Sequence, residues 1–258
     1  MSDLIVLLRR EGFSRTSLRL TVWGRRSGLL RLTARGMMRP GNNRLGDLAC
    51  EYDLARVVFF TAGSPGTGIL ADYALLRPLA RRLQEAERPG EWYPALWAVR
   101  EAVLGLWEGF PTEPADAPRV SGILRRFLGS LGRAEPVWAG VGCIMELLAV
   151  AGLRPELGRC ASCGGALAEG AVFSPREEGL LCPACAGSGH GPRLDAGVLR
   201  YLERLARGGV RAAAGLGAPG RRRGRAVMWL LDAWFRVTIG SGLGSLELLV
   251  PEDGRQRA

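Results

Sequence analysis

The sequence predicts an α+β fold: a small β-barrel followed by an all-helical domain that carries an inserted four-cysteine metal module. Three observations predict it: apolar and polar residues alternate along parts of residues 1–71, apolar residues recur at helical spacing from about residue 72, and two Cys-x-x-Cys pairs lie within 158–187. We therefore expect domains at 1–71 and 72–258. With 258 residues, 47% of them hydrophobic, the chain can bury a sizeable core.

Two neighbouring segments of the first domain have the pattern of paired β-strands. Their apolar residues alternate with Arg, Thr or Trp; the apolar positions are Leu18, Leu20, Val22, Leu30, Leu32 and Ala34. A period of two places one set of side chains inward and the other outward. Residues 24–28 have the composition of a hairpin turn, and 54–60 is a further apolar strand. Five short strands in about 70 residues indicate a small barrel.

Helical periodicity is expected to begin near Asp72. The most complete apolar stripe runs over residues 120–131, and a second runs over 141–151. Asp195 is suited to cap the helix that follows it. Residues 208–220 are rich in Gly and Ala, which predicts a surface loop before a last helix.

The cysteine pairs predict a metal site. Eighteen residues separate the pairs, and the expected ligands are Cys160, Cys163, Cys182 and Cys185. Two thiolates three positions apart can chelate one ion from a tight turn, and two such pairs complete a tetrahedral S₄ site that suits Zn²⁺. We expect one structural zinc, since a closed Cys₄ site leaves no position for water or substrate. A disulfide pair, a redox Cys-x-x-Cys and a site that has lost its metal are the alternatives.

The other cysteines and the apolar runs indicate the compartment. Cys50 and Cys143 stand in apolar surroundings and are expected to be unpaired core thiols. The opening apolar run, 4–8, is too short for a secretion signal, and no segment has the length of a membrane span. We expect a cytoplasmic protein with reduced thiols.

Positive charge is concentrated at the start of the chain. All 35 basic residues are Arg, and the net charge is +10. Residues 1–46 hold ten Arg and two acidic residues, a net of +8, whereas residues 47–258 hold 25 Arg and 23 acidic residues, a net of +2. Concentrated positive charge is typical of a polyanion partner, most often nucleic acid. A solvated basic face without a partner is the alternative.

The outward face of the first strands is the candidate nucleic-acid interface. Arg side chains supply phosphate contacts, and an exposed Trp can stack on unpaired bases. The candidate contact residues are Arg19, Trp23, Arg25, Arg26, Arg31, Arg35, Arg39 and Arg44. Trp23 has an alternative role as a core residue at the barrel end. A second basic run, 221–225, is either a further contact or an exposed charged loop.

The sequence does not predict an enzyme. The single histidine, His190, lies in a loop rich in Gly, Ser and Pro, so no Ser/His/Asp set is expected. The absence of Lys excludes a lysine-containing phosphate-binding loop, which argues against a nucleotidase. We expect no small-molecule substrate and no membrane partner. The alternatives are a zinc-containing nucleic-acid-processing enzyme and an RNA-binding factor.

The order of these features resembles the RecO family of bacterial recombination mediators. Three stretches carry the resemblance: 21–36 with Arg44-Leu45-Gly46, the cysteine module with Phe173 and Gly179 between its pairs, and the tail 239–245. The resemblance implies an N-terminal OB fold, a helical C-terminal domain and an inserted zinc finger. It also implies binding of single- and double-stranded DNA, annealing of complementary strands, and, with RecR, loading of RecA onto strands covered by single-strand-binding protein. Such a protein would be cytoplasmic and nucleoid-associated.

Overall fold

The structure, a computed structural model, describes residues 1–39, 51–61, 63–84, 86, 89–108, 113, 115–187, 193–216 and 220–249. The chain divides into two compact units. The first joins Met1–Gly90 to Trp107–Arg133, and the second joins Glu91–Leu106 to Ala134–Ala258. A β-barrel in the first unit, helices in both and a four-cysteine cluster in the second confirm the predicted α+β class.

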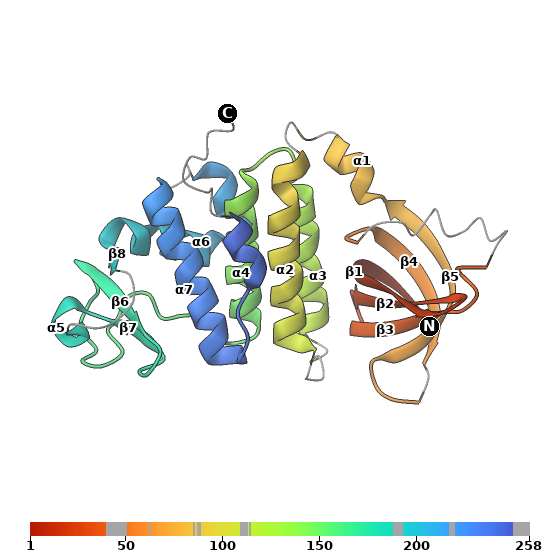
Figure 1. The fold of residues 1–258 in the computed structure, drawn as a ribbon, viewed down its shortest axis with the longest axis horizontal. Helices are drawn as coiled ribbons and strands as arrows, with labels where there is room; N and C mark the ends of the chain where they lie inside the picture. Colours follow the sequence, from red (N-terminus) through yellow and green to blue (C-terminus); the bar gives the residue numbers. More distant parts are fainter. Residues whose placement is uncertain are drawn as a thin grey trace. The chain divides into compact units, whose positions relative to one another are not determined.

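The barrel consists of β1 (Ser2–Ser14), β2 (Ser17–Gly24), β3 (Gly28–Ala34), β4 (Leu54–Thr61) and β5 (Thr67–Arg77). These strands close in the order β1-β2-β3-β5-β4, and β1 pairs with β4 to complete the ring (Figure 1). Only the β3–β5 pairing is parallel. Two irregularities in the long β1 bend it so that it can pair with both neighbours. A five-stranded barrel of this kind is the OB fold.

The barrel core confirms the predicted alternation. The inward side chains are buried and form one cluster that includes Ile5, Leu7, Leu18, Leu20, Val22, Leu30, Leu32, Ala34, Val57 and Phe59. The predicted start of the helical region near Asp72 is too early. Residues 72–77 are still part of β5 and pair with β4. Strand pairing thus overrides the helical spacing of apolar residues in this segment. Helix α1 spans only Leu79–Gln84, and its first N–H donates to the buried carboxylate of Asp53.

Helix α3 (Asp116–Gly129) belongs to the same unit as the barrel and contacts β1, β2 and β3. Its buried side chains confirm most of the apolar stripe predicted over 120–131, from Val120 to Leu128. The helix covers part of the outer surface of β2, where Thr21 is buried. The outer face of the barrel is therefore open to solvent on only part of its area.

The second unit is built from α2 (Trp92–Trp107, whose last residue lies in the first unit), α4 (Pro136–Val150), α6 (Ala196–Gly215) and α7 (Arg221–Ile239). Two short 3₁₀ helices, η2 (Pro89–Glu91) and η3 (Gly244–Leu249), flank this set. The stripe predicted over 141–151 is buried in α4 up to Leu148, where it packs against α6. None of the helices in the described ranges has the length and hydrophobicity that a bilayer span requires.

The prediction of a surface loop over 208–220 is wrong for residues 208–215, because α6 continues to Gly215. The helix changes direction at Gly209, whose φ of 53° and ψ of −137° are not helical. The N–H of Val210, freed by this kink, donates to Glu146 Oε1 at 2.9 Å. A Cβ on Gly142 of α4 would lie 2.7 Å from the Gly209 backbone, so two glycines permit this close approach.

The cysteine module lies between α4 and α6. It contains β6 (Gly170–Ser174), β7 (Gly179–Leu181), α5 (Pro183–Ala186) and β8 (Arg193–Asp195), and its sheet has the order β7-β6-β8. Phe173 of β6 is fully buried, and its ring lies 6.0 Å from Trp229 and 5.8 Å from Trp234 of α7. The module is therefore anchored to the helices through an aromatic cluster.

Candidate nucleic-acid interface and metal centre

Four of the predicted contact arginines lie on one concave surface of the barrel. We call this surface the arginine face; its lining includes Phe13, Arg19, Arg31, Thr33, Arg35, Arg39, Thr67 and Ile69. The strand register explains the grouping, because Arg19 pairs with Thr33 and Thr33 pairs with Ile69 across β2, β3 and β5. Side chains of paired residues point to the same side of a sheet.

The arginines of this face differ in how much of their charge is free. Arg31 is held by an ion pair at 2.8 Å with Glu108, a partly exposed interaction. The guanidinium carbon of Arg19 lies 4.3 Å from the centre of the Phe13 ring. Glu11 stands opposite Arg19 in the β1–β2 register, but its carboxylate lies 3.8 Å from Arg9. Within the described part of the chain, no carboxylate forms an ion pair with Arg19, Arg35 or Arg39, and all three are exposed. Their charge can therefore be neutralised by an external anion.

Arg25 and Arg26 lie on a different surface, which we call the turn surface. Its cationic residues are Arg25, Arg26, Arg56, Arg77, Arg82, Arg125 and Arg126, contributed by the β2–β3 turn, β4, β5, α1 and α3. The buried carboxylate of Asp3 fixes the turn by accepting hydrogen bonds from the N–H groups of Arg26 (2.9 Å) and Ser27 (3.0 Å). A Cβ on Gly24 would lie only 2.5 Å from Asp3 Oδ2, so glycine is required there.

Trp23 does not have the exposure that base stacking requires. Its side chain is 0% exposed, its indole Nε1 donates to the carbonyl of Ala117 at 3.0 Å, and its ring packs edge-on against Trp107 with centroids 5.1 Å apart. The alternation of β2 correctly separates Trp23 from the barrel core. The exposure needed for stacking is therefore wrong, and the alternative, a buried residue at the end of the barrel, is correct, because α3 covers this end of the strand.

Two further expectations concern residues elsewhere. Arg44 lies outside the described residues, as do Cys50 and His190. Residues 222–225 lie in the first turns of α7, where Arg223 Nε pairs with Asp195 Oδ2 at 2.9 Å. The basic run is therefore helical rather than part of a loop, and one of its charges is engaged by a carboxylate.

Some residues of these two surfaces are not among the nucleic-acid contacts predicted from the sequence. Phe13 is half exposed, and its signal is an isolated aromatic residue in an otherwise polar stretch, 11–17. Arg56 lies at an outward position of the predicted strand 54–60. Arg125 lies on α3 away from the apolar stripe. Only the fold brings Arg56 and Arg125 to the same surface as Arg25.

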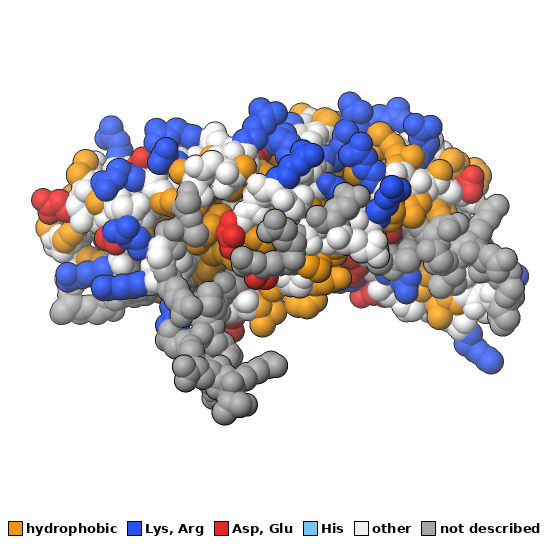
Figure 2. All heavy atoms as spheres, turned by 90° about the horizontal axis from the view of Figure 1, so that it is seen from above, with side chains coloured by type: hydrophobic (Ala, Val, Ile, Leu, Met, Phe, Trp, Pro, Cys, Tyr) orange, Lys and Arg blue, Asp and Glu red, His pale blue; other side chains and the backbone are white. Residues whose placement is uncertain are grey.

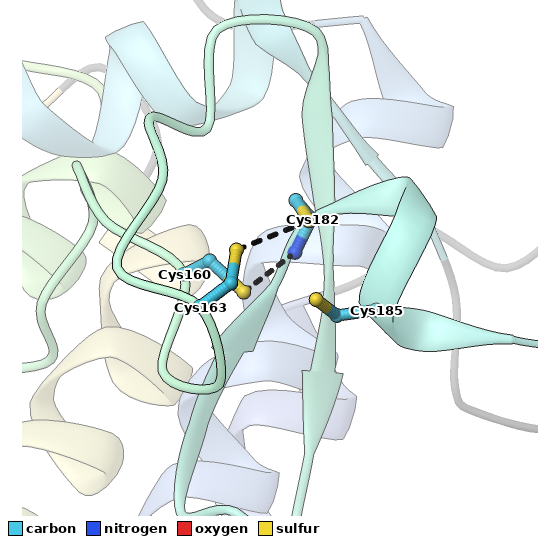
Figure 3. A group of neighbouring side chains, drawn as sticks. All are labelled: Cys160, Cys163, Cys182 and Cys185. Carbon is cyan, nitrogen blue, oxygen red and sulfur yellow. Dashed lines mark hydrogen bonds between the residues drawn. The ribbon is translucent and has the colours of Figure 1, made fainter.

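The four cysteines converge on one point in the second unit (Figure 3). Their sulfur atoms all lie within 4.8 Å of one another. Cys160 and Cys163 lie in one tight turn, in which the N–H of Gly164 donates to the carbonyl of Cys160 at 2.9 Å. Cys182 follows β7, and Cys185 lies in α5, where its N–H donates to the carbonyl of Cys182 at 3.0 Å.

The four sulfur atoms are close enough to shift one another's pKa values, in opposite directions for Cys160 and Cys185. Hydrogen bonds from the backbone of Cys163 and then of Cys182 lower the pKa of Cys160 to about 6. The N–H of Cys182 lies 3.3 Å from that sulfur. A hydrogen bond with the Cys182 side chain is the main cause that raises the pKa of Cys185 to about 12. A metal ion binds the deprotonated form of cysteine, so an ion at the centre of the cluster would favour the thiolate at all four positions.

The geometry fits a tetrahedral metal site. Bonds of about 2.3 Å to each sulfur in a tetrahedron separate neighbouring sulfurs by about 3.8 Å. The Cys163 and Cys182 sulfurs are 3.9 Å apart. Cys143, in contrast, lies outside this cluster and is fully buried in α4, as expected of a core residue.

Exposed arginines are more numerous than exposed carboxylates on the face of the molecule drawn in Figure 2. This distribution agrees with the net charge of +10. The unit with the barrel carries both arginine-lined surfaces, whereas the cysteine cluster lies in the other unit.

Comparisons with known proteins agree with these features. The family model described as "Recombination protein O C terminal" matches residues 124–247. A DNA repair protein RecO from Anaeromyxobacter dehalogenans is 40% identical over 132 residues, which cover 49% of this chain and 51% of that protein. The RecO protein of Desulforudis audaxviator is 28% identical over 186 residues (70% and 68%), and that of Symbiobacterium thermophilum is 27% identical over 226 residues (81% and 80%).

The match therefore spans about half the length of the Anaeromyxobacter protein and most of the other two. The stretch that the family model matches includes the cysteine module and the helices on both sides of it. The barrel order and the helical unit are those expected from the resemblance of the sequence. The chain belongs to the RecO family of DNA repair proteins.

Proposed function

We propose that this protein is a recombination mediator in DNA repair that binds single- and double-stranded DNA through its barrel. The observation that carries the proposal is the arginine face, on which Arg19, Arg35 and Arg39 are exposed and form no ion pair with a carboxylate of the described residues. This face includes β2 and β3, the strands with which OB folds bind oligonucleotides. Guanidinium groups bind phosphates and release condensed counterions.

The turn surface supplies a second set of phosphate contacts. Arg25 stands on a turn that Asp3 holds in place, so its guanidinium is presented from a rigid base. Arg26 is partly engaged, because its Nη2 donates to the carbonyl of Ser2 at 2.6 Å. Arg44 belongs to the same proposed contact set on the grounds of charge. Trp23 does not, because it is buried.

Binding of this kind supports annealing. Two DNA strands repel each other through their phosphates, and a basic surface that neutralises both lowers this repulsion. As a member of its family, the protein would act with RecR on strands covered by single-strand-binding protein and assist RecA indirectly. These partners place it in the cytoplasm, in association with the nucleoid.

The protein acts by binding, without hydrolysing nucleotide or cutting strands. Among the described residues that line the arginine face there is no acidic side chain, and the carboxylate of Glu108 beside it is paired with Arg31. Strand cleavage by metal ions uses several carboxylates around the metals. A nucleic-acid-processing enzyme would require them on this surface.

The cysteine cluster holds one structural Zn²⁺. Cys160, Cys163, Cys182 and Cys185 supply four thiolates, and no open position is left for a substrate. When bound, the ion ties the turn of the first pair to β7 and α5. It thereby supports the strand that places Phe173 against Trp229 and Trp234.

Titration of labelled single-stranded DNA into point variants tests the DNA-binding proposal. Arg35→Ala and Arg39→Ala should each weaken binding about equally for all sequences and reduce the salt slope by about one unit per lost phosphate contact. Arg211→Ala, an exposed arginine of the second unit, is the matched control. Normal binding by the barrel variants together with loss in Arg222→Ala would place the DNA site on the helices instead.

Two additions to this titration separate the rival functions. Structured RNA that competes as well as single-stranded DNA would favour an RNA-binding factor. Metal-dependent cleavage of the labelled strand, lost in a point variant of this chain, would identify a processing enzyme.

A further inference from the structure

We propose that Phe13 and Phe60 are the base-stacking residues of the arginine face, and that they raise the affinity of the protein for single strands relative to duplexes. The inference rests on the proposed DNA-binding function and adds the residues that would distinguish the two kinds of DNA. Neither residue is singled out by charge or by spacing in the sequence. The β1–β2 hairpin brings Phe13 to the arginine face, and the pairing of β4 with β5 brings Phe60 there.

Phe13 lies near the end of β1 and is 51% exposed. It lines the arginine face together with Arg19, Arg35 and Arg39. The Arg19 guanidinium lies 4.3 Å from the centre of its ring. A base that stacks beside this ring therefore brings its phosphate close to an arginine, and the guanidinium plane can itself stack on a base.

Phe60 reaches the same face from β4 and is 63% exposed. It stands directly opposite Ile69 of β5, which lines the arginine face. Side chains of residues directly opposite each other in an antiparallel pair lie on the same side of the sheet, with Cβ atoms about 5 Å apart. The neighbouring Phe59 is buried in the barrel core, which confirms that Phe60 points outward.

A single row of paired residues connects the cationic and the aromatic ends of this surface. Arg19 pairs with Thr33, Thr33 with Ile69, and Ile69 with Phe60, across four neighbouring strands. Since neighbouring strands are about 4.8 Å apart, Arg19 and Phe60 are separated by roughly 14 Å along this row. A single DNA strand that follows this row would contact both Arg19 and Phe60 within the 4–16 nucleotides that OB folds typically cover.

The two kinds of side chain contribute differently to binding. Arginines contact phosphates, which single strands and duplexes both present. Aromatic rings require unpaired bases, because the bases of a duplex are already stacked on one another. Each stacked base contributes about 5- to 150-fold in affinity, without preference for sequence. The phenylalanines therefore raise the affinity for single strands selectively.

The test compares single-stranded DNA with a duplex of the same length at one salt concentration. Phe13→Ala and Phe60→Ala should each weaken single-strand binding by at least about 5-fold and duplex binding by less than about 2-fold. The salt slope should stay unchanged, because no phosphate contact is lost. Phe13→Tyr and Phe60→Tyr keep the ring and should bind as the wild type does.

Two controls exclude a structural explanation. Phe13→Leu and Phe60→Leu keep an apolar side chain without a π face and should behave as the alanine variants do. Tyr93→Ala removes an exposed aromatic residue from the second unit and should leave both affinities unchanged. Thermal unfolding of each variant confirms that the fold is retained.

Three outcomes would overturn the inference. Normal single-strand binding by the Phe13→Ala/Phe60→Ala double variant, with weakened binding by Arg35→Ala, would refute the stacking role and leave the DNA-binding proposal intact. Equal losses for single strands and duplexes would assign the phenylalanines a role other than stacking. Normal binding by both the phenylalanine and the Arg35→Ala variants would show that the arginine face is not the DNA site.

Discussion

Asp3 illustrates how one buried carboxylate organises a functional turn. Its side chain is only 4% exposed and accepts hydrogen bonds from the N–H groups of Leu4, Arg26 and Ser27 and from the Ser27 hydroxyl. A carboxylate out of water is tolerated only when its lone pairs are satisfied in this way. The result is that the β2–β3 turn, and with it Arg25, is held in one geometry before any ligand binds.

Trp23 is expected to matter for folding and not for binding. Trp23→Phe removes the hydrogen bond to Ala117 and part of the contact with Trp107, which should lower the free energy of unfolding by about 1–3 kcal/mol. Urea unfolding measures this loss. DNA affinity, measured where the variant is folded, should equal that of the wild type. If the variant instead lost affinity for single-stranded DNA at unchanged stability, Trp23 would have a role in base stacking and this prediction would be wrong.

At the scale of elements, α6 depends on the cap at its first turn. Asp195 is the N-cap residue: its Oδ1 accepts the N–H of Val198 at 2.9 Å, and its Oδ2 pairs with Arg223 of α7. The hydrogen bond from Arg223 is the main cause that lowers the pKa of Asp195 below its ordinary value, with the N–H of Val198 adding to it. One residue thus joins the start of α6 to the first turns of α7.

Asp195→Ala should lower the free energy of unfolding by about 1 kcal/mol at neutral pH. The pKa of Asp195 is lower in the folded than in the unfolded protein. Its ionic stabilisation is therefore present above the ordinary pKa of about 3.9 and is lost as the pH falls through the folded value. Denaturant unfolding at pH 7 and at stepwise lower pH should show the wild type and the variant converge below about pH 4.

Asp195→Asn is the matched variant, because asparagine also caps helices and lacks only the charge. It should lose less stability than Asp195→Ala at pH 7. Its difference from the wild type should vanish on acidification. A difference between wild type and Asp195→Asn that grew at low pH would contradict the assigned direction of the pKa shift.

At the scale of the whole molecule, the metal centre is expected to determine whether the second unit holds its structure. Phe173 packs against Trp229 and Trp234, so loss of the ion should loosen the module and change their environment. Structural zinc contributes on the order of 10 kcal/mol in small finger peptides, so removal should be strongly destabilising. A chelator at mildly acidic pH, where protons compete with the metal ion for the thiolates, should therefore lower the melting temperature and alter tryptophan fluorescence.

Cys182→Ser should reproduce the effect of the chelator, whereas Cys143→Ser, which alters a buried thiol outside the cluster, should leave the metal content unchanged. Elemental analysis should find one zinc per chain. Protein that is purified without chelator and contains no zinc would refute the structural-zinc proposal.

Local patterns in the sequence determined several features of the protein without help from the tertiary structure. The inward faces of β2 and β3 follow from period-two alternation, and the stripes of α3 and α4 follow from helical spacing. The convergence of the four cysteines follows from two chelating turns at a suitable separation. In each case, the property depends on neighbours within a few residues or on a motif with one dominant geometry.

The tertiary structure alone decided which outward residues meet solvent and which surfaces they form. Trp23 and Arg19 share the same face of β2, yet α3 buries the tryptophan and leaves the arginine exposed. Barrel closure places Phe60 beside the arginine face and separates Arg25 from Arg35. Strand alternation specifies the side of a sheet to which a residue points. What covers that side depends on elements distant in the sequence, whose packing optimises burial over the whole molecule.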